Sequence, residues 1–161
     1  MFTKPKNGWT EIHLEDFEGL GSYVQDVPVD VMFACICSLW HDTPLELRFD
    51  EEGSAFTLTA EETTKIVTEG EFGAEEYHIK RSKMELIREI IDDMEAYFEE
   101  WIQFSEEYAC FEDDEAEAKE ELYDKRFCVI NMLIEELENA FVNKTEDMDA
   151  EDTEKDTDAV F

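Results

Sequence analysis

The sequence predicts an α+β fold, in which a small antiparallel sheet with one short buried helix is followed by a long antiparallel helical hairpin and a disordered acidic tail. Three observations support this prediction. Apolar residues alternate with polar ones before residue 83, recur at helical spacing after it, and nearly vanish after residue 144. The expected organisation is a single domain over residues 1–144, β-rich with one helix in 1–82 and helical in 83–144, followed by a tail over 145–161.

The N-terminal part of the sheet begins with a strand at Trp9–Leu14, where polar and apolar side chains alternate strictly. Gly19-Leu20-Gly21 is interpreted as a break after this strand, because glycines commonly mark turns. Residues 22–27 form a second short candidate strand.

A helix is predicted to begin around Pro28 and to end before Thr43-Pro44. Proline suits a first helical turn, where its missing N–H would be unpaired anyway, and Asp26 just upstream is a candidate cap. The apolar residues at helical spacing are Val31, Met32, Cys35, Ile36 and Leu39. Because this helix is apolar on nearly all sides, we expect it to be buried.

The strands that follow are predicted to form an antiparallel meander with one wet face. Apolar residues alternate with charged ones over 45–50 and with threonines over 56–59, on either side of a turn at 51–54. Residues 64–68 and 76–80 can extend this hairpin to four or so strands. We expect helices to cover one face of the sheet.

The C-terminal half is predicted to be helical from Ser82 onward. Ser82 and Glu85 match a capping box, in which the two side chains satisfy free backbone N–H groups at a helix start. An apolar stripe without glycine or proline runs from there to about Phe111, which predicts one helix of nearly 30 residues. A second stripe runs from Tyr123 to Phe141, after an acidic segment that can cap a new helix, so the two stripes predict a helical hairpin.

Acidic residues dominate the composition, with 45 Asp and Glu against 13 Lys and Arg and a formal net charge of −32. This excludes proteins that bind nucleic acid or anionic membranes through a basic surface. A hydrophobic fraction of 43% still suits a folded core. No apolar run approaches the length of a membrane span, about 18 residues, and the four cysteines follow no apolar leader, so we expect a cytoplasmic protein.

No motif for catalysis or cofactor binding stands out in the chain. It has no phosphate-binding glycine loop, no nucleophile elbow and no paired Cys-x-x-Cys. Cys35, Cys37 and His41 do not suit a metal site, because positions i and i+2 of a helix point in different directions. We therefore expect a protein that is not an enzyme and has neither a cofactor nor a metal.

The long helix is predicted to expose acids opposite its apolar stripe, with few lysines between them. Like charges four residues apart destabilise a helix by about 0.2–0.5 kcal/mol per pair. One interpretation is a solvated face of an acidic protein. The other is a binding face, because carboxylates at i and i+4 rise about 6 Å, close to the spacing of successive phosphates along a nucleic-acid strand. The candidate partner-binding residues are Asp92, Asp93, Glu99, Glu100, Glu106, Glu107, Glu112, Asp113 and Asp114.

In size, charge and mixed α/β composition, the chain resembles the acidic nucleic-acid mimics of phages and mobile elements, the anti-CRISPR and anti-restriction inhibitors. The resemblance implies a non-enzymatic inhibitor that binds the basic nucleic-acid-binding surface of a nuclease or other defence protein, with no direct contact to nucleic acid or membrane. Two alternatives stay open: an immunity protein that neutralises a bacterial toxin, and an acidic chaperone of basic proteins in which the tail does the binding. The identity of the target and whether the chain forms a homodimer also stay open.

Overall fold

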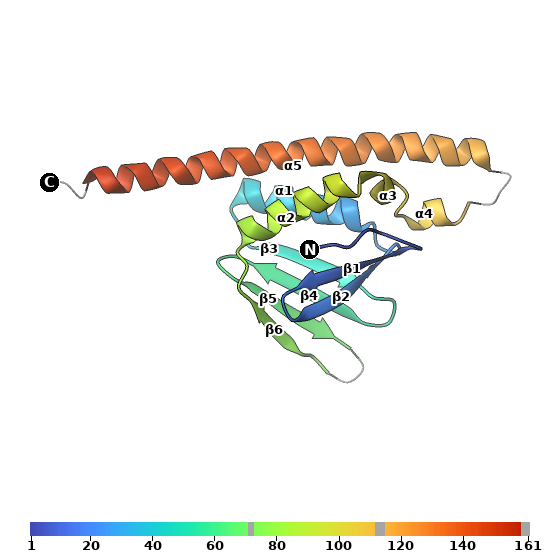
Figure 1. Ribbon diagram of the computed structural model, residues 1–161, viewed down its shortest axis with the longest axis horizontal. Helices are drawn as coiled ribbons and strands as arrows, with labels where there is room; N and C mark the ends of the chain where they lie inside the picture. The colour runs from blue at the N-terminus through green and yellow to red at the C-terminus, as the bar shows by residue number, and fades with distance from the viewer. Residues whose placement is uncertain (71–72, 112–114, 159–161) are drawn as a thin grey trace.

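The computed structural model describes the backbone of residues 1–70, 73–111 and 115–158, and it arranges the chain in three layers (Figure 1). One long helix lies on top, shorter helices form the middle layer, and two antiparallel sheets lie below. The strands are β1 (Trp9–Leu14), β2 (Phe17–Ser22), β3 (Leu45–Asp50), β4 (Ala55–Ala60), β5 (Thr64–Glu69) and β6 (Glu76–Ile79). The helices are α1 (Val27–His41), α2 (Lys83–Ala96), α3 (Phe98–Ile102), α4 (Glu106–Ala109) and α5 (Ala116–Asp158). The α+β prediction is confirmed at this level.

The N-terminal hairpin pairs β1 with β2 and corrects one sequence prediction. The turn lies at Glu15 and Asp16, where Glu15 has a φ of 51°, and Gly19 and Gly21 lie inside β2 rather than at a break. A Cβ atom on Gly19 would come within 2.6 Å of the Phe56 ring. Glycine is therefore required for close packing at this point and not for a change of chain direction. The second candidate strand, over residues 22–27, is wrong, because Ser22 ends β2 and the chain turns there into α1, which begins at Val27.

Helix α1 begins as predicted, with a proline in its first turn, and ends at Asp42 in the left-handed conformation. Asp26 stands at the N-cap position, but its side chain makes no capping hydrogen bond. The expectation that the whole helix is buried is wrong. Phe33 and Trp40 are 60% and 61% exposed, on the side of α1 that faces away from the core.

Strands β3 to β6 form the predicted antiparallel meander, in sequence order. In β3, Leu45, Leu47 and Phe49 are buried and the residues between them are exposed, so one face of the sheet is wet. The buried face meets α1 and α2 in a core rich in aromatic rings. The Phe49 and Phe56 rings stack with centroids 4.9 Å apart, and Trp101 reaches the same core through Phe2.

The single helix predicted over residues 83–111 is wrong, because the chain divides into α2, α3 and α4. The capping box of Ser82 and Glu85 starts α2 as expected. The helical path ends at Gln103, and Ser105 then caps α4 by accepting a hydrogen bond from the Tyr108 N–H. This break depends on a distant residue, the buried Arg126 of α5, which donates hydrogen bonds to the carbonyl oxygens of Trp101, Ile102 and Phe104 at 3.2, 2.5 and 3.0 Å.

Helix α5 differs from the prediction in its packing partners and in where it ends. It packs against α1 as well as against α2 and α3, so the expected hairpin of two long helices is not confirmed. The disordered tail is not confirmed either. The backbone of residues 145–158 continues α5, with no glycine or proline after residue 116 to end it, while residues 159–161 of the predicted tail lie outside the described residues. At 43 residues the helix is about 65 Å long, and it extends past the rest of the fold towards its C-terminal end (Figure 1).

Candidate functional site

The predicted partner-binding acids occupy three different helices rather than one continuous face. Asp92 lies on α2, is exposed, and pairs with Arg88 at 3.4 Å. Such an exposed pair one helical turn apart contributes only a few tenths of a kcal/mol, about 0.3–0.5 kcal/mol. Its carboxylate therefore remains available to a partner.

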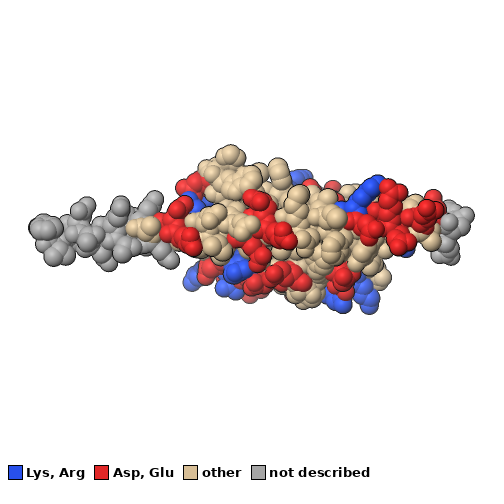
Figure 2. All heavy atoms as spheres, turned by 90° about the horizontal axis from the view of Figure 1, so that it is seen from above, with Lys and Arg blue, Asp and Glu red and all other residues tan. Residues whose placement is uncertain are grey.

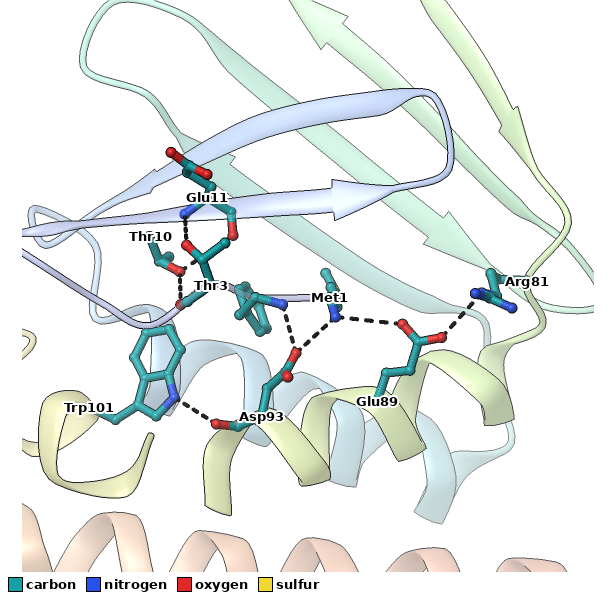
Figure 3. A network of polar contacts seen from close by, with 9 residues as sticks. Met1, Thr3, Thr10, Glu11, Arg81, Glu89, Asp93 and Trp101 are labelled. Carbon is teal, nitrogen blue, oxygen red and sulfur yellow. Dashed lines mark hydrogen bonds and ion pairs between the residues drawn. The ribbon is translucent and has the colours of Figure 1, made fainter. Parts of the chain in front are cut away.

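Asp93 points away from solvent, towards the N-terminal segment (Figure 3). Its carboxylate accepts a hydrogen bond from the Phe2 N–H at 2.6 Å and pairs with the Met1 amino group at 2.9 Å. The indole N–H of Trp101 donates to the Asp93 carbonyl oxygen at 3.2 Å. The adjacent Glu89 bridges the same amino group and Arg81. Asp93 therefore joins α2 to the N-terminal segment in the fold, a contact that the acid count in the sequence did not show.

Glu99 and Glu100, on α3, both have partners within the chain. The Tyr123 hydroxyl donates to Glu99 at 2.6 Å, which raises the pKa of the tyrosine. Lys4 binds Glu100 at 2.7 Å, and this hydrogen bond lowers the pKa of the Glu100 carboxyl. These two acids are consequently tied to α5 and to the N-terminal segment.

Glu106 and Glu107 lie in the first turn of α4, exposed to solvent, beside the first turns of α5. Helix α4 is held there by Tyr108, whose ring lies 4.9 Å from the Lys119 ammonium group. We call this region the acidic end. The acidic end comprises Glu106 and Glu107 with the exposed Glu117, Glu120, Glu121 and Asp124 of α5. Glu112, Asp113 and Asp114 lie outside the described residues.

The carboxylates of the acidic end are only partly neutralised. Lys125 pairs with Glu121 at 2.7 Å, which lowers the pKa of that carboxyl and raises the pKa of the lysine, and the charge of Glu107 adds to this rise. Among the described side chains, Glu106, Glu117 and Glu120 have no basic partner within ion-pair distance. Figure 2 shows acidic groups crowded at the end where α5 begins. The α5 acids were missing from the predicted site, although the density of Glu after residue 115 signalled them.

The cysteines divide between the core and the surface. Cys35 is buried, and its burial raises the pKa of the thiol. Cys110 and Cys128 are exposed. Within the described residues, no three His, Cys, Asp or Glu side chains come together as they would around a metal ion. None of the described helices is long and apolar enough to cross a membrane.

We compared the chain with models of known protein families, with curated proteins and with solved structures. None of the three comparisons found a match.

Proposed function

We propose that this chain is a non-enzymatic acidic inhibitor, which binds the basic nucleic-acid-binding surface of a nuclease or another defence protein and acts as a DNA or RNA mimic of the anti-CRISPR or anti-restriction kind. The single observation that supports it is the acidic end. There, exposed carboxylates with few basic neighbours are fixed on two packed helices, in a chain with a net charge of −32.

The geometry of the acidic end suits this role. Glu117 and Glu121, and likewise Glu120 and Asp124, are four residues apart on α5, so each pair rises about 6 Å along the helix. Successive phosphates of a nucleic-acid strand have a similar spacing. Because the helices that carry the charges are already folded, little ordering of the backbone opposes binding, and the field of the whole protein steers a basic partner towards the acidic end.

The test is competition on purified nucleases. A panel of restriction endonucleases and CRISPR-associated nucleases is assayed for cleavage and for binding of labelled substrate with increasing amounts of the chain. We expect inhibition of at least one nuclease, displacement of its substrate, and no binding of the chain to nucleic acid alone. Inhibition should weaken as salt rises, because screening shortens the range of the charges.

A matched pair of variants locates the site. The triple variant Glu106→Lys, Glu120→Lys, Asp124→Lys should lose inhibition. The control Glu46→Lys, Glu61→Lys, Glu62→Lys changes the net charge equally, at exposed positions on and beside the sheet, and should retain it. Equal loss of inhibition in both variants would show that inhibition depends on net charge and not on the position of the acids. A nuclease that binds the chain and its substrate simultaneously would refute mimicry.

A further inference from the structure

Seven large apolar side chains of the described residues are exposed on α1 and α5, namely Phe127, Val142 and Met148 of α5 and four others. The four others are Phe33 (60%) and Trp40 (61%) of α1, and Val129 (41%) and Met132 (59%) of α5. In a chain this acidic, exposed apolar groups of this size add nothing to solubility. We call these four residues the apolar row.

The helices α1 and α5 run parallel and side by side, which brings the apolar row onto one face. Asp26 before α1 contacts Arg126 at 2.7 Å, and Asp42 after α1 contacts Lys144 at 2.9 Å, so the two helices stay in register over their common length. On α1, Phe33 and Trp40 are seven residues apart, which is two turns and about 10 Å on the same side.

The row's α5 members lie on the edge next to α1. The opposite edge of α5 contacts α2 and α3. Phe127 packs edge-on against Phe98 of α3, and the Arg88 guanidinium of α2 lies over the Phe141 ring. Val129 and Met132 project from the other side of the helix, about 160° and 140° from Phe127 by helical geometry. Figure 2, seen from the α5 side, shows uncharged side chains across the middle of this face, with acidic groups among them.

Carboxylates border the apolar row on both helices. Asp30 of α1 and Glu135 and Glu136 of α5 are exposed, and among the described residues Asp30 and Glu136 have no basic partner. An apolar centre with a charged rim is the usual anatomy of a protein interface. The rim repels a second copy of a chain with a charge of −32 and attracts a positively charged one.

We propose that the face of α1 and α5 around the apolar row docks an amphipathic basic helix of a partner protein, with the partner's apolar stripe on Phe33, Trp40, Val129 and Met132 and its lysines or arginines on the acidic rim. The spacing of Phe33 and Trp40 matches the i, i+3, i+4, i+7 repeat of such a helix. This inference rests on the proposed function only for the positive charge of the partner, and it places the apolar anchor of the complex away from the acidic end.

The test uses two synthetic probes with equal numbers of lysines. One is an amphipathic peptide of leucine and lysine with leucines at helical spacing, and the other is an oligolysine. Both are titrated into the full chain by calorimetry, and the exposed Trp40 provides a local fluorescence signal. We expect the amphipathic peptide to bind about tenfold more tightly than the oligolysine, because only it can bury the apolar row.

The variant Phe33→Gln, Trp40→Gln keeps helix-forming residues in α1 and should reduce this preference to about twofold or less, with oligolysine binding unchanged. The control Leu20→Gln, Val24→Gln removes exposed apolar groups of 40% and 52% exposure elsewhere and should keep the full preference. Equal affinities for the two probes in the unmodified chain would overturn the proposal. A dimer seen by sedimentation and abolished by Phe33→Gln, Trp40→Gln would also overturn it, by assigning the face to a second copy. Because no nuclease is used, failure here is separate from failure of the nuclease competition.

Discussion

Asp26 and Arg126 form a two-point ion pair across 100 positions of sequence, with Nη1 2.7 Å and Nη2 3.0 Å from the two carboxylate oxygens. The arginine side chain is 11% exposed, and its remaining donors bind the carbonyl oxygens left free where α3 ends. One side chain thus joins the start of α1, the end of α3 and the first third of α5. Its planar donor groups suit several acceptors in a way that an ammonium group does not.

Replacing this arginine should be among the most damaging single changes in the chain. Arg126→Met is expected to lower the free energy of unfolding by about 3–5 kcal/mol, because it leaves Asp26 and the freed carbonyl oxygens without their donor. Asp26→Asn should cost less, since the guanidinium keeps its carbonyl partners. Urea unfolding of both variants and of the double variant gives the coupling between the two residues. A loss of unfolding free energy below 1 kcal/mol for Arg126→Met would show that this side chain does not hold the three helices together.

Two tryptophans offer a matched test of burial. Trp101 is 0% exposed and packs edge-on against Phe2 and Phe104, so Trp101→Ala should cost about 3–5 kcal/mol in unfolding free energy. Trp40→Ala removes the same side chain from a largely exposed position and should cost less than about 0.5 kcal/mol. Denaturant titrations of the two variants measure the difference. Similar losses of unfolding free energy in the two variants would contradict either the burial of Trp101 or the exposure of Trp40.

The Asp42 contact gives a prediction for pH. The hydrogen bond and charge of Lys144 lower the pKa of the Asp42 carboxyl in the folded chain. A carboxylate with a lowered folded-state pKa stabilises the fold above its unfolded-state pKa, and this contribution is lost as pH falls through the folded-state value. Asp42→Asn retains a residue that tolerates the left-handed backbone found here. We expect this variant to be less stable than the unmodified chain at neutral pH and equal to it in acid, as followed by urea unfolding. A difference that persists at low pH would point to a packing effect.

Deleting residues 145–161 separates the proposed inhibitor from the acidic chaperone. The described contacts of this segment are few: Thr145 donates to the Val142 carbonyl oxygen at 2.8 Å, and Met148 is 49% exposed. We expect a loss of less than about 1 kcal/mol in stability and unchanged inhibition of a target nuclease. Binding that disappears with the segment would favour the chaperone, in which the acidic tail is the working part.

The elements that the sequence predicted correctly depend on local patterns. Strands β1 and β3 to β6 show alternation, and α1 and the start of α2 show a proline and a capping box, all readable within a few residues. The predictions that were wrong concern features that contacts between distant parts of the chain determine. Gly19 is explained by the Phe56 ring, and the break after α3 by Arg126, neither of which is a neighbour in sequence.

The candidate site was predictable in composition and not in arrangement. Counting acids identified Glu106 and Glu107, but only the packing of α4 on α5 brings them beside Glu120 and Asp124. The same count included Asp93, whose carboxylate is taken by the N-terminal segment. The exposed side of α1 was missed because an apolar residue that faces solvent and one that faces the core look alike in sequence. Partner binding by the acids remains a prediction.

The parallel packing of α1 and α5 also affects how the chain folds as it is made. Helix α1 leaves the ribosome long before Arg126 is synthesised, by on the order of ten seconds at ordinary rates of translation. During that interval its apolar residues lack the helix that later covers one side of them. Non-local pairing of this kind slows folding and exposes the chain to aggregation. The mutual repulsion of so many carboxylates would then keep nascent chains apart until their last helix arrives, an advantage that precedes any encounter with a partner.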